Sequence, residues 1–461
     1  MARVGSRMTA DVVVVGAGAF GLATAATLAA AAPAAKILVY ERDVTTPTNA
    51  ELGSGSVIAA GTRLQRQAGV DDDPDAMADD ILAKSHGTDE RLVRRLCAES
   101  PHAVDWLLDE VGVPLELATE ARRVGHGRIR LHATRERSGA PLIGALRTHT
   151  VGRPGVRIVD HTAVADLVYE GGRVAGIRTG AVDGGLEMRA SATVLACGGF
   201  AADRATMERY LPTVASARYL GGRGHRGDAV RWAAEVSADL VDMGGYLGQG
   251  YAIACATDPR HHAARLNPGI VTAGAVIVDR TGHRVVREDQ GYSEWAGVMF
   301  ERFGGLGIAV WDDRIQRAYG DTGAMRDVTA VDGVHTAATV AELATLVDVP
   351  AQALTATVDA YNAGIARGVD PLGREIGGEP LRAPFYAAAI TGGVLQSLGG
   401  MRVDVCGRVL GVDGAPITDL YAGGAAAAGL SGGSPDGYLS GSGLLTSLVF
   451  GRMVGRHLAS L

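Results

Sequence analysis

The sequence predicts an α/β fold in which a domain built on a parallel sheet is interrupted by an inserted α+β domain. Residues 12–15, 21–32 and 37–40 predict a strand, a helix and a strand, and both strands are uniformly apolar, as in a parallel sheet. Between about residue 251 and residue 395, short strands and helices alternate without a glycine-rich turn of the nucleotide-binding type. From Gly399 onward, glycine-rich strand–turn–helix patterns return. This order predicts one domain made of both ends of the chain, with another inserted between them.

Further local patterns predict the elements between these landmarks. Ser100 and Pro101 have the composition of a helix start, with an N-cap followed by proline in the first turn. The acidic run 71–73 predicts another, solvated helix start. Residues 163–169 and 174–179 flank a Gly-Gly turn and predict a β-hairpin. Residues 193–196 predict a further buried strand.

Composition excludes several classes of partner. The chain has 461 residues, 47% of them hydrophobic, and a net charge of −7 without a dense Lys/Arg run, so nucleic acid is not an expected partner. Four widely spaced cysteines form no Cys-x-x-Cys pair, and His261-His262 has no third ligand at metal spacing, so no metal is expected. The apolar run 12–35 is interrupted by glycines and by Pro33, which argues against a membrane span. A cytoplasmic protein is expected.

A dinucleotide-binding turn joins the first strand to the first helix. It reads Gly16-Ala17-Gly18-Ala19-Phe20-Gly21, in which the glycines permit a tight turn, admit a pyrophosphate and let helix and strand pack closely. The helix N-terminus offers N–H groups to phosphate. Glu41, about 20 residues further on at the end of the second strand, stands where a ribose-binding carboxylate belongs. Arg42 follows it.

Three more segments carry a resemblance to a known family. They are Gly53-Ser54-Gly55-Ser56 with Ala59-Ala60-Gly61-Thr62, then Thr193-Val194-Leu195-Ala196-Cys197-Gly198-Gly199-Phe200, and finally Tyr421-Ala422-Gly423-Gly424 with Gly441-Ser442-Gly443-Leu444-Leu445. In this order they resemble the fumarate reductase/succinate dehydrogenase flavoprotein superfamily, and within it the 3-ketosteroid Δ1-dehydrogenase-like branch. The resemblance covers nearly the whole chain.

The resemblance implies a Rossmann-like FAD-binding domain of the GR2 type over residues 8–250 and 396–461, and an inserted catalytic domain over 251–395. It also implies FAD contacts at Gly16, Gly18, Ala19, Phe20, Gly21, Glu41, Arg42, Gly53, Ser54, Gly55, Ser56, Gly61, Thr62, Ala163, Val164, Ala196, Cys197, Gly198, Asp228, Gly423, Gly424, Ser442, Gly443, Leu444 and Leu445. Residues 49–52 contain no histidine where covalent members tether the flavin. Noncovalent FAD is therefore expected.

The same resemblance shows what replaces the fumarate-reducing groups. Tyr292 and Tyr438 stand at the positions of two substrate-gripping arginines, and Gln396 replaces a substrate-binding histidine. Pro268 and Val271 replace the glutamate and arginine of the proton relay. Fumarate chemistry is thus lost at several separate positions.

The replacements match the ketosteroid dehydrogenase pattern instead. This implies a Tyr292 base, and an oxyanion hole formed by the Tyr438 hydroxyl and the Ser442 N–H. Such donors lower the barrier because α-proton removal builds negative charge on the carbonyl oxygen. A role at the substrate is implied for His132, with His126 as the alternative.

The leading hypothesis is an FAD-dependent α,β-dehydrogenase that converts a 3-oxosteroid-like or smaller cyclic ketone, for example of the 4-oxocyclohexanecarboxylate type, to an enone. Quinone, O2 or an electron-transfer protein would accept the electrons. One alternative is a dicarboxylate dehydrogenase or reductase of the fumarate reductase family that uses Arg128, Arg130 or Arg223 as cations. The other alternative is a flavin-binding protein without turnover.

Overall fold

The chain folds into two compact units. A computed structural model describes residues 8–119, 123–180, 185–255, 264–375 and 379–461. Unit 1 comprises Met1–Tyr210, Gly221–Tyr246 and Gln396–Leu461, and unit 2 comprises Leu211–Leu220 and Leu247–Leu395. His261 and His262 lie outside the described residues.

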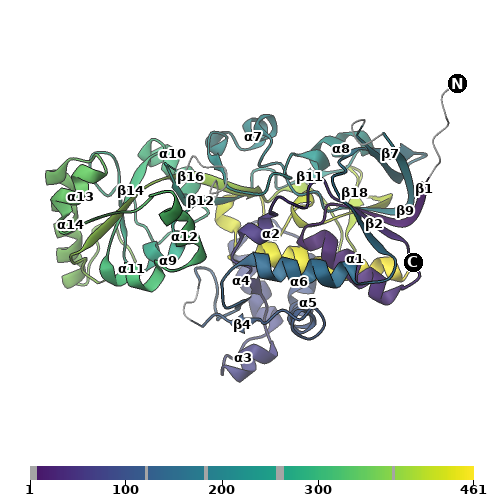
Figure 1. The fold of residues 1–461 in the computed structure, drawn as a ribbon, viewed down its shortest axis with the longest axis horizontal. Helices are drawn as coiled ribbons and strands as arrows, with labels where there is room; N and C mark the ends of the chain where they lie inside the picture. The colour runs from purple at the N-terminus through teal and green to yellow at the C-terminus, as the bar shows by residue number, and fades with distance from the viewer. Residues whose placement is uncertain (1–7, 120–122, 181–184, 256–263, 376–378) are drawn as a thin grey trace. The chain divides into compact units, whose positions relative to one another are not determined.

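Unit 1 is built on an eight-stranded sheet with the order β18-β19-β8-β9-β1-β2-β6, in which β7 pairs with β8 (Figure 1). β1 runs parallel to β2 and β9, and β19 runs parallel to β9. The loops after these strands, which begin at Gly16, Glu41, Ala196 and Gly423, therefore meet at one edge of the sheet, where open α/β sheets bind ligands. The strands are β1 Met8–Val15, β2 Ile37–Tyr40, β6 Val156–Val159, β7 Val164–Glu170, β8 Arg173–Thr179, β9 Glu187–Leu195, β18 Arg408–Leu410 and β19 Pro416–Ala422.

Helices from both ends of the chain cover this sheet. The alanine-rich α1 (Ala19–Ala31) is buried along most of its length and packs against α6 (Gly139–Val151) and the C-terminal α16 (Phe450–Ala459) (Figure 1). A Cβ on Gly455 would lie 2.7 Å from the Thr24 carbonyl oxygen, so the contact of α16 with α1 depends on glycine. The other helices are α2 Asn49–Leu52, α3 Arg63–Gln67, α4 Pro74–Lys84, α5 Glu90–Asp109, α7 Arg204–Tyr210, α8 Asp228–Val236 and α15 Ser442–Leu444.

Two small sheets and three irregular helices complete unit 1. One sheet joins β3 (Val57–Ile58), β5 (Leu131–Ala133) and β4 (Glu116–Leu117), and the other joins β11 (Leu240–Val241) to β17 (Gly400–Met401). The irregular helices are the 3-10 turns Gly424–Ala426 and Pro435–Gly437 and the π-helix Leu445–Val449.

One expected helix start is wrong. Ser100 and Pro101 lie inside the longer helix α5. Pro101 has no N–H for the Cys97 carbonyl one turn earlier, and the Ser100 hydroxyl donates to that oxygen instead, at 2.8 Å. In this helix, Ser100 therefore supplies the hydrogen bond that Pro101 cannot, and the two residues allow α5 to continue through the proline.

The expected hairpin is confirmed. β7 and β8 are antiparallel, and Gly171 and Gly172 at the turn have φ of 56° and 80°. Positive φ at both central residues defines the two-residue hairpin turn for which Gly-Gly is favoured.

Unit 2 is an α+β domain on a six-stranded sheet with the order β10-β16-β14-β13, in which β12 and β15 also pair with β16. β14 is antiparallel to β13 and β16, and Trp295 and Trp311 are fully buried in the core. The strands are β10 Arg218–Tyr219, β12 Tyr246–Ile253, β13 Val276–Val278, β14 Gly307–Asp312, β15 His335–Ala337 and β16 Phe385–Ser397. The helices are α9 Pro268–Thr272, α10 Trp295–Phe303, α11 Asp313–Tyr319, α12 Gly323–Ala330, α13 Val340–Leu346, α14 Ala351–Ala366 and the 3-10 turn Pro212–Val214.

The α/β fold with an inserted α+β domain is confirmed. The segment Leu211–Leu220 joins unit 2 because β10 pairs with β16, which the sequence did not predict. In the described part of the chain, every helix is too short or too polar to cross a bilayer.

Candidate active site

The turn after β1 leaves room for a phosphate group. A Cβ on Gly16, which has φ of +111°, would overlap the Ala196 carbonyl, and a Cβ on Gly21 would overlap the Gly16 carbonyl. A Cβ on Gly18 would instead meet nothing within 4 Å. Gly16 and Gly21 therefore allow close backbone contacts, and Gly18 leaves open space at the N-terminus of α1. This is the division of roles found in dinucleotide-binding turns.

Glu41 is held in place at the end of β2. Its carboxylate accepts hydrogen bonds from the Ala17 N–H at 2.7 Å and from the Asp43 N–H at 3.1 Å. The Glu41 carbonyl accepts the Thr162 N–H at 2.9 Å, which brings Ala163 and Val164 to the same sheet edge. The carboxylate is thus oriented beside the glycine turn.

Arg42 and Asp228 bind each other. Their side chains form an ion pair at 2.7 Å, and both are partly buried. The sequence predicted them as separate FAD contacts. The pair links the end of β2 to the first turn of α8, and this structural role is the one the contacts support.

A second glycine-rich loop follows α2. A Cβ on Gly55, which has φ of +66°, would lie 2.5 Å from the Ser138 carbonyl oxygen, so the loop is pressed against the start of α6. The Ser54 hydroxyl donates to Ser56 at 3.0 Å, and Gly53 accepts the Gly139 N–H at 3.0 Å through its carbonyl. This packing holds the loop 53–56 in one conformation.

His132 is a buried residue of the small sheet β3-β5-β4. It is fully buried, its Nδ1 donates to the Arg130 carbonyl at 2.8 Å, and its Nε2 accepts the Thr62 hydroxyl at 2.8 Å. Burial lowers the pKa of His132 to about 4, so the ring is neutral. Both ring nitrogens are hydrogen-bonded within unit 1, so the contacts of His132 support a structural role, and its expected role at the substrate stays a prediction. His132 fixes Thr62, which caps α3 after Gly61.

Arg130 is a structural cation. It forms a bidentate pair with Asp72 at 2.8 and 2.9 Å and a further pair with Asp80, and its side chain is 1% exposed. Asp73 caps α4 as expected, but the prediction that Asp72 is solvated is wrong because its side chain is fully buried against Arg130. The dicarboxylate alternative therefore loses Arg130 as a candidate. Arg128 and Arg223 are both exposed.

The strand end at 196–200 and the C-terminal strand end at 422–424 build the other side of the sheet edge. The Phe20 ring lies so close to Gly423 that a Cβ there would overlap it. The Phe200 N–H donates to the Ser397 hydroxyl at 3.0 Å. Burial raises the pKa of Cys197 to about 12, so this thiol next to Gly198 is not a nucleophile.

Gln396 and Tyr438 converge on Gly443. A Cβ on Gly443 would lie 3.6 Å from Gln396 Nε2 and 3.9 Å from the Tyr438 hydroxyl. Gln396, Ser442 and Gly443 also line a cavity of about 30 Å³. Two of the predicted catalytic side chains thus lie together at the N-terminus of α15, where N–H groups point outward.

The Ser442 N–H is already occupied. It donates to the Leu439 carbonyl at 3.0 Å, so the predicted oxyanion-hole donor is satisfied within the turn. The chain then continues through Leu444 and Leu445 into a π-helix, a distortion often found at functional sites. The local turn at 439–442 was not visible from the sequence.

His126 contacts the segment that carries Tyr438 and Ser442. It is 3% exposed, and its Nε2 donates to the Ser440 carbonyl at 3.0 Å. Burial lowers the pKa of His126 to about 4. Of the two candidate histidines, His126 is therefore the one that contacts the segment carrying Tyr438.

In unit 2, buried charges hold the loop that carries Tyr292. Glu288 is fully buried, binds Arg284 at 2.6 and 2.7 Å and Arg374 at 3.4 Å, and accepts the Ile277 N–H at 3.1 Å. The Tyr292 carbonyl accepts the Gly250 N–H at 3.3 Å. Tyr292 itself is partly buried.

Sequence reasoning missed Arg265. It pairs with Ala252 of β12, the strand that also contains Gly250, and it interacts electrostatically with Tyr292 and Asp327. Burial lowers the pKa of Arg265, and these two neighbours oppose that shift. Val271, at the expected relay position, is fully buried in the core. The detectable signal was a lone arginine between the apolar residues Ala264 and Leu266.

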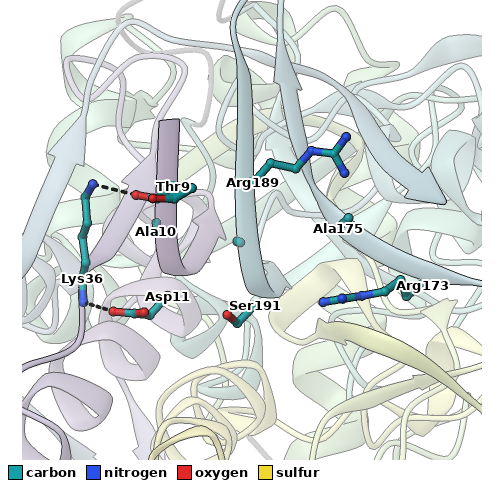
Figure 2. A pocket seen from close by; sticks show the side chains of 9 residues that line it. Thr9, Ala10, Asp11, Lys36, Arg173, Ala175, Arg189 and Ser191 are labelled. Atoms are coloured by element: carbon teal, nitrogen blue, oxygen red, sulfur yellow. Dashed lines mark hydrogen bonds between the residues drawn. The ribbon is translucent and has the colours of Figure 1, made fainter. Parts of the chain in front are cut away.

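A surface pocket lies at the opposite edge of the sheet (Figure 2). Its volume is about 440 Å³, and it lies at the start of β1. There the Lys36 ammonium donates to the Thr9 carbonyl at 2.6 Å, and the Lys36 backbone N–H donates to the Asp11 carboxylate at 2.7 Å. Arg173 pairs with Asp419 at 2.6 Å, and Arg189 pairs with Glu170 at 2.7 Å. Both arginines of this pocket are therefore neutralised, and the pocket lies away from the glycine turns.

Comparison with known proteins agrees with this geometry. The FAD binding domain family matches residues 11–442. The chain belongs to this family. A family defined by FAD binding agrees with the FAD cofactor that the sequence predicted. Within the described residues, no cluster of three metal-ligating side chains occurs.

Several relatives of this flavoprotein are known. An NADH:fumarate oxidoreductase from Klebsiella pneumoniae is 28% identical over 459 residues, covering 97% of this chain but 47% of its own length. The chain thus spans about half the length of that relative. A digoxin reductase from Eggerthella lenta is 27% identical, with 98% of this chain and 87% of its own length covered. The structure of a 3-ketosteroid-Δ4-(5α)-dehydrogenase from Rhodococcus jostii, in complex with 4-androstene-3,17-dione, is 27% identical with a TM-score of 0.76, covering 99% and 98% of the two chains.

The residues at the sheet edge fit FAD. The open side of Gly18, the N-terminus of α1 and the oriented Glu41 carboxylate provide a place for the pyrophosphate and the adenosine ribose. When bound, FAD supplies the acceptor for a hydride.

The flavin is expected to leave the protein on acid treatment, because Asn49 begins α2 where covalent members have a histidine. Acid precipitation followed by a spectrum of the supernatant checks this. Yellow colour that stays in the pellet would contradict noncovalent binding.

Proposed function

We propose that this enzyme is an α,β-dehydrogenase of a cyclic ketone, either a 3-oxosteroid-like ketone or a smaller monocyclic one. On this proposal the FAD-binding domain spans 8–250 and 396–461, and residues 251–395 supply the base. The electron acceptor would be a quinone, O2 or an electron-transfer protein.

The convergence of Gln396 and Tyr438 at Gly443 carries the proposal. Both offer uncharged donors, and Arg130, the most buried cation candidate, is neutralised by Asp72 and Asp80. Uncharged donors suit a carbonyl oxygen, whereas a dicarboxylate calls for cations such as a bidentate arginine. The 27% identity to a ketosteroid dehydrogenase over nearly the full length of both chains supports the same substrate class.

Tyr292 is the proposed base. It accepts the proton from the carbon next to the carbonyl, and the Arg265 guanidinium is its electrostatic neighbour. The negative charge that develops on the carbonyl oxygen is met by the Tyr438 hydroxyl and the Gln396 amide. Bound FAD would accept a hydride from the neighbouring carbon, so that the substrate would lose two hydrogens and become an enone.

A reductase is the second candidate. The Klebsiella and Eggerthella relatives are named as an oxidoreductase of fumarate and a reductase of digoxin. The same groups would work in reverse, with Tyr292 donating a proton to a double bond conjugated to a carbonyl.

Anaerobic titration of the oxidised enzyme tests the function. Steroid ketones or cyclic ketones are expected to bleach the flavin and succinate is not, and the dithionite-reduced enzyme is expected to reduce fumarate negligibly. The expectation rests on the loss of the carboxylate-binding arginines at Tyr292 and Tyr438. Rapid reoxidation by fumarate would overturn the proposal, and reoxidation by enones without bleaching by ketones would favour the reductase.

A further inference from the structure

The side-chain amides of Asn49 and Gln396 form an ordered pair in unit 1. The Asn49 carbonyl oxygen accepts the Gly222 N–H at 2.6 Å, and the Asn49 Nδ2 donates to Gln396 Oε1 at 3.3 Å. A backbone N–H can only donate, so the Asn49 oxygen must face Gly222. The Asn49 NH2 group must then face Gln396, and Gln396 must accept that hydrogen bond through its side-chain oxygen.

This order leaves the Gln396 NH2 group on the side of Gly443. Nε2 has no hydrogen-bond acceptor among the residues that the structure describes, and it borders the cavity at Gly443 with Tyr438 close by. A backbone amide therefore decides, through two side chains, which end of Gln396 faces this cavity.

We propose that Asn49 is a positioning residue that holds Gln396 with its NH2 group toward the substrate, which makes the site selective for an uncharged carbonyl oxygen. The inference rests on the proposed function for the identity of the ligand. The amide takes over as second donor beside Tyr438, since the Ser442 N–H is bound to Leu439. If Gln396 were reversed, its oxygen would meet the carbonyl oxygen of the ligand and repel it.

The variant Asn49→Asp tests directly whether residue 49 sets the orientation of the Gln396 amide. An aspartate can still accept the Gly222 N–H, but it cannot donate, so Gln396 should turn its NH2 group toward residue 49. The affinity for 4-androstene-3,17-dione and for cyclohex-2-enone, followed by flavin absorbance, is expected to fall about 10- to 100-fold. Gln396→Met should weaken binding about 3- to 10-fold, because it removes a donor without adding an acceptor.

The double variant separates the reversal from the added charge. In the Gln396→Met background, Asn49→Asp is expected to change affinity by less than about 3-fold, because no amide remains to turn. Flavin content and Tm of each variant check that the fold is kept. An equal loss in both backgrounds would overturn the inference, even if ketones bleach the wild-type flavin.

Failure of the proposed function gives a different result. If the probes bind and show the coupling between residues 49 and 396 but no ketone bleaches the flavin, the carbonyl site stands and the dehydrogenase activity is refuted. If neither probe binds the wild-type enzyme, the carbonyl site itself is refuted.

Discussion

Tyr292→Phe is expected to slow flavin reduction by a competent ketone about 10²- to 10⁴-fold, the usual contribution of a general base. The phenyl ring keeps the packing of Tyr292 against the unit 2 core, so ketone affinity should change little. Only the hydroxyl that accepts the α-proton is lost. Stopped-flow absorbance at saturating ketone measures the rate, and the concentration dependence gives the affinity.

Two further variants show whether the effect of Tyr292→Phe is specific: one is a matched control and the other removes the neighbouring cation. Tyr386→Phe removes a hydroxyl from the same unit, one that donates to Asp313 at 3.1 Å, and should leave the rate within about 3-fold. Arg265→Met removes the cation beside Tyr292 and should slow reduction without weakening ketone binding. A near-normal rate in Tyr292→Phe would place the base elsewhere and remove the main support for a ketone dehydrogenase.

Tyr438→Phe is expected to fail in a different way, with reduction slowed about 10²- to 10³-fold, the cost of one oxyanion donor. The same hydroxyl also binds the ketone before reaction, so affinity should fall as well. The effect on rate exceeds the effect on affinity because the oxygen carries more negative charge in the transition state. Measuring both constants separates the two tyrosines, and equal losses in rate and affinity would argue against an oxyanion role.

The parts of the fold that depend only on residues close together in the chain could be predicted from the sequence. The turn at Gly16, Gly18 and Gly21 was predictable because each glycine serves a steric need set by a few neighbouring residues. The uniformly apolar runs at β1 and β2 likewise predicted a parallel sheet. The hairpin at Gly171-Gly172 followed from turn chemistry alone.

Features that depend on distant partners escaped prediction. His132 has the polarity of a catalytic residue, but its two hydrogen bonds go to Thr62 and the Arg130 carbonyl. Asp72 has the sequence context of a solvated acid and is buried by an arginine 58 residues away. Arg265 has no motif around it, and its importance appears only when β12 brings it near Tyr292.

The parallel pairing of β19 with β9 also bears on how the protein is made. Leu420, Tyr421 and Ala422 lie opposite Thr193, Val194 and Leu195, so the sheet next to the FAD site is completed by residues synthesised more than 200 positions later. On the ribosome, residues 247–395 emerge before β19 does, and unit 2 can fold while unit 1 still exposes an open strand edge. Until β19 is synthesised, the unpaired edge of β9 can pair with a wrong strand. A chaperone that covers this edge, or FAD that binds early, would protect the nascent chain at this stage.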